Sequence, residues 1–446
     1  MKALKFLKDL IRSKHIQLAL VSGTSIIALA YVSKRVLPEP MGSIYILIPA
    51  LFVTAAEGVM GIKRKKWYSN INYWLITVAL ATILIIFSHL AAVPDPGGNP
   101  GLEKELQAVI DEFLEENDIA PGISACAICP DLQLDWSGVS GTEAKGDSTP
   151  LTPAHTFRIA SNTKTYVAAS VLRLVEMGSI GLDDRLSLHL APGVNGLLRG
   201  DGYDTDAITI AQVLSHTAGL GDHTNDSLFV KRLFDDNQHT WTPEEQIRCL
   251  VDWREPLGEP GEKYVYSDAG YVILGTMVTR ITGSPLGPSV RDLLDFRKLG
   301  LDATYWEYME EPPAPAGPRA HQYFGEVDVT SWNASFDLYG GGGIVTDARE
   351  LAMFMRMLLN GDVYSDESTL EEMTSRGTEP YRLGVMVMEC DGIEVFGHQG
   401  FWNTFAYHVP SLDLTVSGSI LNHDATNGYE LMCRLVNLIN TFKERR

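Results

Sequence analysis

The sequence predicts an α/β domain, in which helices flank a sheet and a mainly helical segment interrupts it, preceded by three membrane-spanning helices. Three observations support this. The first 92 residues contain three long apolar runs, strand-like patterns stand near both ends of the remaining chain, and a polar, loop-rich stretch separates them. The 446 residues exceed what one compact core of usual size holds, so more than one structural unit is expected.

Three apolar runs are predicted to cross a bilayer, and they cover residues 16–32, 44–62 and 73–93. Each is close to the ~20 residues that span the hydrocarbon core. A membrane anchor is therefore expected over residues 1–92. An alternative interpretation takes the first run as a cleaved signal peptide, because Ala28-Leu29-Ala30 ends it with an A-x-A pattern.

Basic residues set the expected orientation of these spans. They gather before the first span and between the second and third: Lys2, Lys5, Lys8, Arg12 and Lys14, then Lys63, Arg64, Lys65 and Lys66. The loop after the first span has only Lys34 and Arg35. Because cytoplasmic flanks accumulate Lys and Arg, we expect a multi-pass protein of the cytoplasmic membrane with its N-terminus inside and residues 93–446 outside.

The two parts of the chain carry opposite net charge. Residues 1–92 hold 11 basic and 3 acidic residues, whereas residues 93–446 hold 25 basic and 53 acidic ones. An acidic domain repels phosphate backbones, so nucleic acid is not an expected partner, and the lipid bilayer is the expected partner of residues 1–92. No metal or other cofactor is expected, since the 11 histidines show no H-E-x-x-H or similar ligand spacing.

The globular part begins after a linker at residues 93–101, which is rich in Pro and Gly. Apolar residues at helical spacing predict a helix from Leu102 to Leu114, and a Pro-Asp turn joins two predicted strands at residues 123–128 and 134–136. A second helix is expected from Ala160 to Met177, where Gly178 ends it.

The rest of residues 102–446 completes the predicted domain. A mainly helical insertion is expected at about residues 186–330. Alternating residues predict strands between Val395 and Ile420, followed by a helix from Tyr429 to Phe442. Strands at both ends with helices packed on them describe an α/β sheet.

Five cysteines are present, and Cys126 and Cys129 form a C-x-x-C pattern inside the first predicted strand. Strand positions three apart point to opposite faces, which is poor geometry for a shared metal. We therefore expect buried free thiols.

A serine and a lysine stand near the start of the second predicted helix, in the segment Ser161-Asn162-Thr163-Lys164. Positions i and i+3 share one helix face, so the Lys164 ammonium can reach the Ser161 hydroxyl. The helix N-terminus offers N–H groups and a positive dipole end that suit a developing oxyanion. By itself this S-x-x-K motif is a weak signal, because chance yields roughly one match in a chain of this length.

Further segments stand in a fixed order around this pair: Phe157 to Ser161, Leu214 to Leu220, Tyr266-Ser267-Asp268, Gly341 to Thr346, and His398-Gln399-Gly400 followed by Phe401. Together they resemble the serine beta-lactamase-like, or penicillin-binding protein, superfamily. The similar branch holds class C beta-lactamases, D-alanyl-D-alanine carboxypeptidases and related esterases. The resemblance extends from about residue 102 to 440, and it implies an antiparallel sheet flanked by helices with a mainly helical subdomain.

The resemblance also implies an acyl-enzyme mechanism on a small-molecule or peptide acyl substrate. Ser161 is then the nucleophile that attacks an ester or amide carbonyl. Lys164 and Tyr266 are expected to share the proton transfers, with His398 as a fourth catalytic residue. The backbone N–H groups of Ser161 and Phe401 are expected to form the oxyanion hole.

Substrate contacts are expected from Asp268, Gln399 and Gly400, and two positions depart from the family's usual pattern. His398 stands where many relatives carry a lysine, and a neutral imidazole is a poorer fixed cation for a substrate carboxylate. Asp268 replaces an asparagine, so it cannot donate to the substrate when ionised. It can pair with Lys164 and raise the pKa of that residue, which favours Tyr266 as the base.

These departures favour an esterase or peptidase over an efficient beta-lactamase. A catalytically silent module that binds a cell-envelope component is the main alternative, and a transporter built from three spans is a weaker one. His216 is expected to support the site without reacting. The natural substrate, the base and the oligomeric state stay open.

Overall fold

A computed structural model describes residues 99–445 of the chain. The predicted spans at residues 16–32, 44–62 and 73–93 lie outside the described residues, so the anchor stays a prediction. Within the described part, no helix combines the length and the apolar character that crossing a bilayer requires. The chain divides into two compact units, Met1–Gly97 and Gly98–Arg446, and the described residues all belong to the second.

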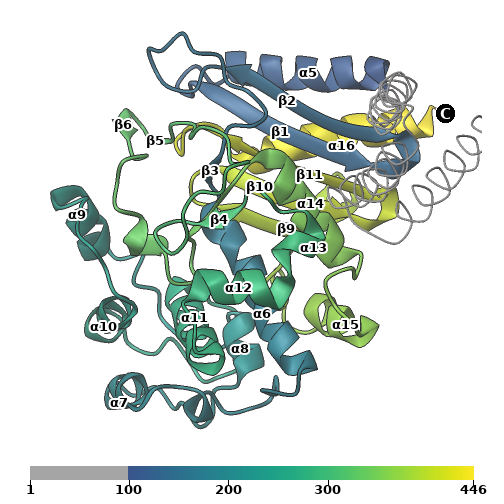
Figure 1. Cartoon of the computed structure of the whole chain (residues 1–446). Coiled ribbons are helices and arrows are strands. Elements are labelled where there is room, and N and C mark those ends of the chain that lie inside the picture. The colour runs from purple at the N-terminus through teal and green to yellow at the C-terminus, as the bar shows by residue number, and fades with distance from the viewer. Residues whose placement is uncertain (1–98, 446) are drawn as a thin grey trace, which may run out of the picture. The chain divides into compact units, whose positions relative to one another are not determined.

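A six-stranded antiparallel sheet forms the centre of this unit, with the strand order β2-β1-β11-β10-β9-β8 (Figure 1). Its strands are β1 (Gly122–Cys129), β2 (Leu134–Gly141), β8 (Met386–Cys390), β9 (Ile393–Gly400), β10 (Thr404–Val409) and β11 (Leu414–Ile420). The β1–β11 pair joins the two ends of the domain sequence, with Ile123 opposite Ile420. The predicted α/β class and the antiparallel sheet are confirmed.

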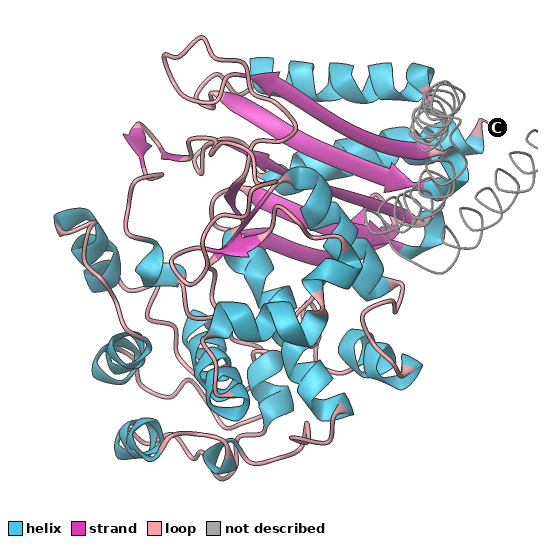
Figure 2. Ribbon diagram, viewed as in Figure 1, coloured by secondary structure: helices cyan, strands magenta, loops and turns pink. Residues whose placement is uncertain are grey.

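Helices cover both faces of the sheet (Figure 2). α5 (Pro100–Glu115) and α16 (Gly428–Glu444) pack on one face, and α14 (Ala348–Leu359) packs on the other. The predicted first and last helices are thereby confirmed. α5 begins two residues inside the predicted linker, because the Asn99 side chain accepts from the N–H of Leu102 and Pro100 suits a first helical turn.

The segment between β2 and α14 is mainly helical up to residue 299. Its helices are α6 (Thr163–Glu176), α7 (Pro192–Gly200), α8 (Ile210–Leu214), α9 (Ser227–Asp235), α10 (Pro243–Trp253), α11 (Asp268–Thr282), α12 (Leu286–Leu294) and α13 (Phe296–Leu299). α6 packs against α11 and α12. The stretch from 305 to 346 instead contains the short strands β4 (Tyr305–Trp306), β5 (Tyr323–Phe324), β6 (Val327–Asp328) and β7 (Ile344–Thr346), and β7 also pairs with β3 (Phe157–Arg158).

Cys126 and Cys129 point to opposite faces of β1, as expected, and two other cysteines form a disulfide. Cys126 packs in the core on the α6 side of the sheet, and Cys129 packs in the core beneath α5 and α16. Both are buried and free, as predicted. Cys390 and Cys433 form a disulfide between β8 and α16. This disulfide was not predicted from the sequence, because 43 residues separate the two cysteines and no local pattern connects them.

Candidate active site

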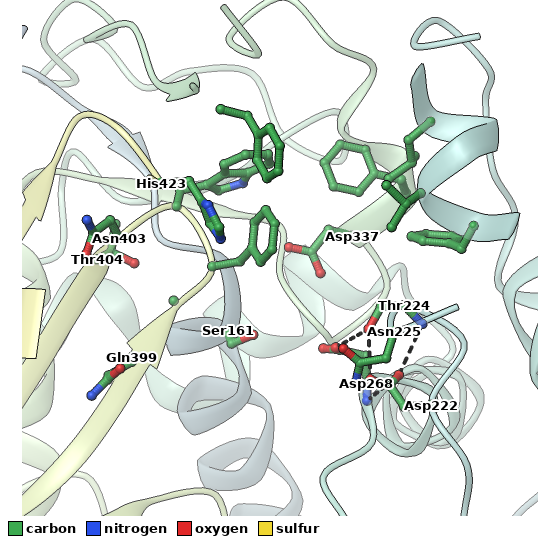
Figure 3. Close-up of a pocket in the computed structure, with 18 of the residues that line it drawn as sticks. Ser161, Asp222, Thr224, Asn225, Asp268, Asp337, Gln399, Asn403, Thr404 and His423 are labelled. Carbon is green, nitrogen blue, oxygen red and sulfur yellow. Dashed lines mark hydrogen bonds between the residues drawn. The ribbon is translucent and has the colours of Figure 1, made fainter. Parts of the chain in front are cut away.

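A cavity of about 1030 Å³ lies between the β9–β10 turn, the start of α6 and the helix α9 (Figure 3). The structure brings six of the eight predicted site residues to its wall, namely Ser161, Tyr266, Asp268, Gln399, Gly400 and Phe401. The other two, Lys164 and His398, are fully buried.

Ser161 lies in the 3-10 turn Ala160–Asn162, which directly precedes α6. The expected helix start at Ala160 is therefore three residues early. Ala160 has a φ of +46°, a conformation that is sparsely populated for a residue with a side chain, and it turns the chain sharply before Ser161. β10 holds this turn, because the Asn162 amide donates to Thr404 Oγ1 at 3.0 Å and Thr404 Oγ1 donates to the carbonyl of Ile159 at 2.9 Å.

Lys164 lies one helical turn after Ser161, and its ammonium is satisfied by three acceptors. Nζ donates to Ser161 Oγ at 3.0 Å and to the Gly341 carbonyl at 2.8 Å, and it forms an ion pair with the Asp268 carboxylate. Burial acts to lower the pKa of Lys164, but the charge of Asp268 outweighs it and the net pKa is raised. Lys164 is therefore a cation at neutral pH.

Asp268 opens helix α11, where the Ser267 hydroxyl caps the helix by accepting from Gly270 N at 3.1 Å. Its second carboxylate oxygen accepts from Thr224 Oγ1 at 2.8 Å. Burial acts to raise the pKa of Asp268, but the charge and hydrogen bond of Lys164 outweigh it and lower that pKa. The pair of Lys164 and Asp268 is thus ionised, and Asp268 faces the lysine as well as the cavity.

Two further carboxylates line the cavity, Asp222 and Asp337 (Figure 3). The Asp222 carboxylate accepts from Asn225 Nδ2 at 2.7 Å, and it shares the single Thr224 Oγ1 hydrogen, at 2.8 Å, with Asp268. Burial, and then the charge of Asp268, raise the pKa of Asp222 to about 7. Burial also raises the pKa of Asp337 to about 7, although the Lys164 charge opposes this. The site therefore concentrates carboxylates whose ionisation responds to neighbouring charge.

Tyr266 lies over the lysine, whose Nζ is 5.1 Å from the centre of the ring. Burial raises the pKa of Tyr266, and interactions with Lys164 and Ser161 only partly offset it, so the phenol is protonated at neutral pH. The His216 ring packs 4.3 Å from the Tyr266 ring. His216 Nδ1 accepts from the Ser267 N–H at 3.1 Å, and burial lowers the pKa of His216, so its proton is on Nε2.

His398 is neutral and its tautomer follows from its partners. Burial lowers the pKa of His398 to about 3, and the Lys164 charge lowers it further. Nδ1 lies 2.6 Å from the Gln399 carbonyl, which only accepts, so Nδ1 carries the proton. Nε2 must then accept from the Tyr381 hydroxyl at 2.8 Å. Both nitrogens of His398 are occupied, and among the described residues neither bonds to Tyr266.

The end of β9 approaches Ser161 closely. A Cβ atom at Gly400 would lie 2.2 Å from the Ile159 carbonyl, so this position requires glycine. Figure 3 shows the Gln399 side chain directed away from Ser161, and that side chain contacts Tyr407, so a substrate contact at Gln399 would come from its backbone. Phe401 is 52% exposed in the turn before β10.

Aromatic and aliphatic side chains make up much of the remaining wall: Phe229, Val230, Leu233 and Phe234 from α9, with Phe324, Trp332, Phe336, Phe401 and Trp402 opposite. Figure 3 shows rings on both sides of the opening, with the Asp337 carboxylate between them. The arrangement offers an apolar pocket beside a serine, with polar groups at one end.

Asp222, Asp337 and Tyr381 belong to the site but were not predicted from the sequence. Asp222 follows the segment Leu214 to Leu220 by two residues, and Asp337 precedes the glycines at 340–343, so each lies beside a segment that was recognised. That proximity is the only signal the sequence offered, because a single aspartate in a loop has no period or spacing that separates it from a surface residue.

The family model described as Beta-lactamase matches residues 106–427. A curated protein of Salmonella paratyphi A, named "Putative D-alanyl-D-alanine carboxypeptidase", is 28% identical over 259 residues. The match covers 51% of this chain and 58% of that protein, so the chain spans little more than half the length of this relative.

Two solved structures are similar in fold. The D-stereospecific amidohydrolase from Streptomyces sp. has a TM-score of 0.62 at 28% identity, covering 73% of this chain and 97% of its own. The D-amino acid amidase from Ochrobactrum anthropi SV3, complexed with L-phenylalanine amide, has a TM-score of 0.65 at 21% identity, covering 77% and 99%. At that identity the second structure supports the fold alone.

Proposed function

The chain belongs to the beta-lactamase family of serine hydrolases, and from this premise we propose that it hydrolyses an ester or amide through an acyl-enzyme on Ser161. The observation that carries the proposal is the 3.0 Å contact between Ser161 Oγ and the buried Lys164 ammonium at the wall of the cavity. This contact places Lys164 Nζ where it can take up the proton that Ser161 Oγ loses.

The proton route starts from an ionised pair, so Lys164 has no free lone pair at rest. Tyr266 is a protonated phenol at rest, so we do not assign it the role of base that the raised pKa of Lys164 favoured. We infer that one Lys164 proton moves to Asp268, after which the neutral amine accepts the Ser161 proton as Oγ attacks the carbonyl. Tyr266 then donates its phenol proton to the leaving group and is reprotonated from Lys164. The remaining proton returns from Asp268 to the lysine, so the proton lost by Ser161 ends on the leaving group.

The proposed oxyanion hole consists of the N–H groups of Ser161 and Phe401, since both residues line the same cavity. His398 is proposed to act by position, because its two nitrogens are held by Tyr381 and by the Gln399 carbonyl. Water completes the cycle by hydrolysing the acyl-enzyme.

The test uses the full chain in detergent with p-nitrophenyl acetate and butyrate, following product release and intact mass together. We expect Ser161→Ala to lower the rate at least about ten-thousand-fold and to form no acyl adduct. Ser179→Ala, at an exposed serine after α6, is the matched control and should behave as wild type. If well-folded wild type gives neither turnover nor adduct, a binding module for a cell-envelope component becomes the better proposal.

We also propose that residues 1–92 anchor the protein and that the hydrolase unit lies outside the cytoplasmic membrane. The distribution of basic residues supports this, and so does the Cys390–Cys433 disulfide, because disulfides persist in oxidising compartments. Protease added to intact spheroplasts should remove the hydrolase unit. Digestion only after lysis would reject the orientation.

A further inference from the structure

Carboxyl groups outnumber cations in and around the cavity. Asp222, Asp268 and Asp337 line it, and no Lys or Arg belongs to its described wall. Lys164, behind the wall, is paired with Asp268. His223 lies 4.0 Å from Asp222, but burial lowers the pKa of His223 to about 4, so it is neutral at neutral pH. Two carboxylates therefore lack a cationic partner among the described residues.

Of these two carboxylates, Asp337 is the one with more free capacity to bind a ligand. Among the described residues no hydrogen bond or ion pair reaches its carboxylate, whereas Asp222 accepts from Thr224 and Asn225. The Arg158 guanidinium, which influences Asp337 electrostatically, donates instead to Glu307 and to the carbonyls of Val329 and Trp332.

The backbone passes close to the Asp337 carboxylate at Gly342. A Cβ atom at Gly342 would lie 2.0 Å from Asp337 Oδ2, so the chain passes this group at a distance that only glycine allows. Figure 3 shows the carboxylate directed into the cavity, on the side where Ser161 lies. A largely buried carboxylate without a donor is costly, and a cationic ligand would remove that cost.

The wall of the cavity next to Asp337 is apolar and aromatic. α9 contributes Phe229, Val230, Leu233 and Phe234, and Phe401 lies across the opening. Such a wall takes up an apolar group, and aromatic faces also attract organic cations. The described residues contain no group of three or more His, Cys, Asp or Glu side chains placed to hold a metal ion, so the geometry favours an organic cation.

Building on the proposed acyl transfer, we propose that the substrate carries a free ammonium group near its scissile carbonyl, bound by Asp337 beside Asp222, and an apolar or aromatic group held against α9. The corresponding compounds are amides or esters of apolar amino acids, and peptides with a free amino terminus. Substrates that carry a carboxylate at this end are repelled by the same charges.

The test compares, on the full chain, the two enantiomers of phenylalanine p-nitroanilide with 3-phenylpropionic acid p-nitroanilide, which differs from them only in lacking the amine. For the better enantiomer we expect kcat/KM at least about ten-fold above that of the amine-free compound, as one charged hydrogen bond would produce. Asp337→Asn should bring the ratio close to one. Asp362→Asn, at an exposed aspartate after α14, should retain it.

A wild-type ratio near or below one, or an unchanged ratio in Asp337→Asn, overturns the proposal. Hydrolysis of p-nitrophenyl butyrate is followed in parallel. If it depends on Ser161 while the amine preference is missing, only the substrate inference fails, whereas loss of all Ser161-dependent hydrolysis rejects the proposed function.

An inhibition measurement on wild type covers the case in which Asp337→Asn does not fold. Phenethylammonium and 3-phenylpropionate share the aromatic group and differ in charge. We expect phenethylammonium to inhibit butyrate hydrolysis competitively with a constant at least about ten-fold lower than that of 3-phenylpropionate. Equal inhibition, or the reverse order, contradicts an ammonium site.

Discussion

The two faces of the six-stranded sheet bury different kinds of side chain. Beneath α5 and α16 the core consists of apolar groups such as Leu106, Phe113 and Leu435. On the other face, the unit built on α6 also buries the charge of Lys164 together with the neutral rings of His216 and His398. Burial of hydrocarbon is favourable almost regardless of the neighbour, whereas each buried polar group needs a specific partner.

This difference separates the two roles of the core: the face beneath α5 and α16 mainly stabilises the fold, and the α6 side holds the reactive groups. The Lys164 ammonium has three acceptors, and the Asp337 carboxylate has none among the described residues. The contribution of the apolar face to the free energy of unfolding should therefore be independent of pH and should fall when a buried side chain is shortened. Activity and stability on the α6 side should depend on pH and on the presence of each charge partner.

The largest effect is expected for Lys164→Met, which removes the cation next to Ser161 and leaves Asp268 without its partner. We expect kcat/KM for p-nitrophenyl butyrate to fall on the order of a thousand-fold. Lys104→Met, at an exposed lysine of α5, is the control and should retain activity. If Lys164→Met keeps more than about a tenth of the activity, the buried Lys164 ammonium has no catalytic role.

Leu435→Ala tests the apolar face. The side chain is fully buried on α16, so we expect a loss of about 2–5 kcal/mol in the free energy of unfolding, measured by urea titration of the full chain. The loss should be the same near pH 5 and pH 8, and the folded fraction should keep its activity. Leu188→Ala, at a side chain 65% exposed, should change stability by less than about 0.5 kcal/mol.

Asp337→Asn should stabilise the protein in a pH-dependent way. Folding raises the pKa of Asp337 from 3.8 to about 7, so between these values the folded state binds more protons and wild-type stability falls as pH rises. Asparagine does not titrate, so the stability of the variant does not fall in this way as the pH rises. We expect a gain of about 1–3 kcal/mol near pH 8 that vanishes near pH 4. Destabilisation near pH 8 would show that the carboxylate has an internal partner.

The smallest effect is expected for Tyr381→Phe, which removes the hydroxyl that donates to His398 Nε2. Leaving a buried acceptor unsatisfied should cost about 1 kcal/mol in the free energy of unfolding. Tyr166→Phe is the matched control, because the buried Tyr166 hydroxyl has no hydrogen-bond partner among the described residues. Equal losses in the two variants would argue against the assigned tautomer of His398.

Local spacing in the sequence was enough to predict several helices and strands and the contact between Ser161 and Lys164. Apolar periodicity was enough for the helices at 100–115 and 428–444 and for the first two strands, because one buried face repeats along each element. Ser161 and Lys164 meet because three residues make nearly one helical turn, a distance that needs no tertiary contact. The pairing of Asp268 with Lys164 was also within reach, since motif order places both at one site.

The electrostatics of the cavity, by contrast, depend on tertiary contacts. Asp222 reaches the cavity from a loop, and Asp337 reaches it from the end of the 3-10 turn Ala334–Asp337, more than a hundred residues later. Tyr381 meets His398 through the packing of a loop on β9. The protonation of Lys164, Asp337 and His398 depends on burial and on neighbours that no spacing encodes. Short-range patterns report which face of an element is buried, but the charge of a group is set by whatever the whole fold brings within a few ångströms of it.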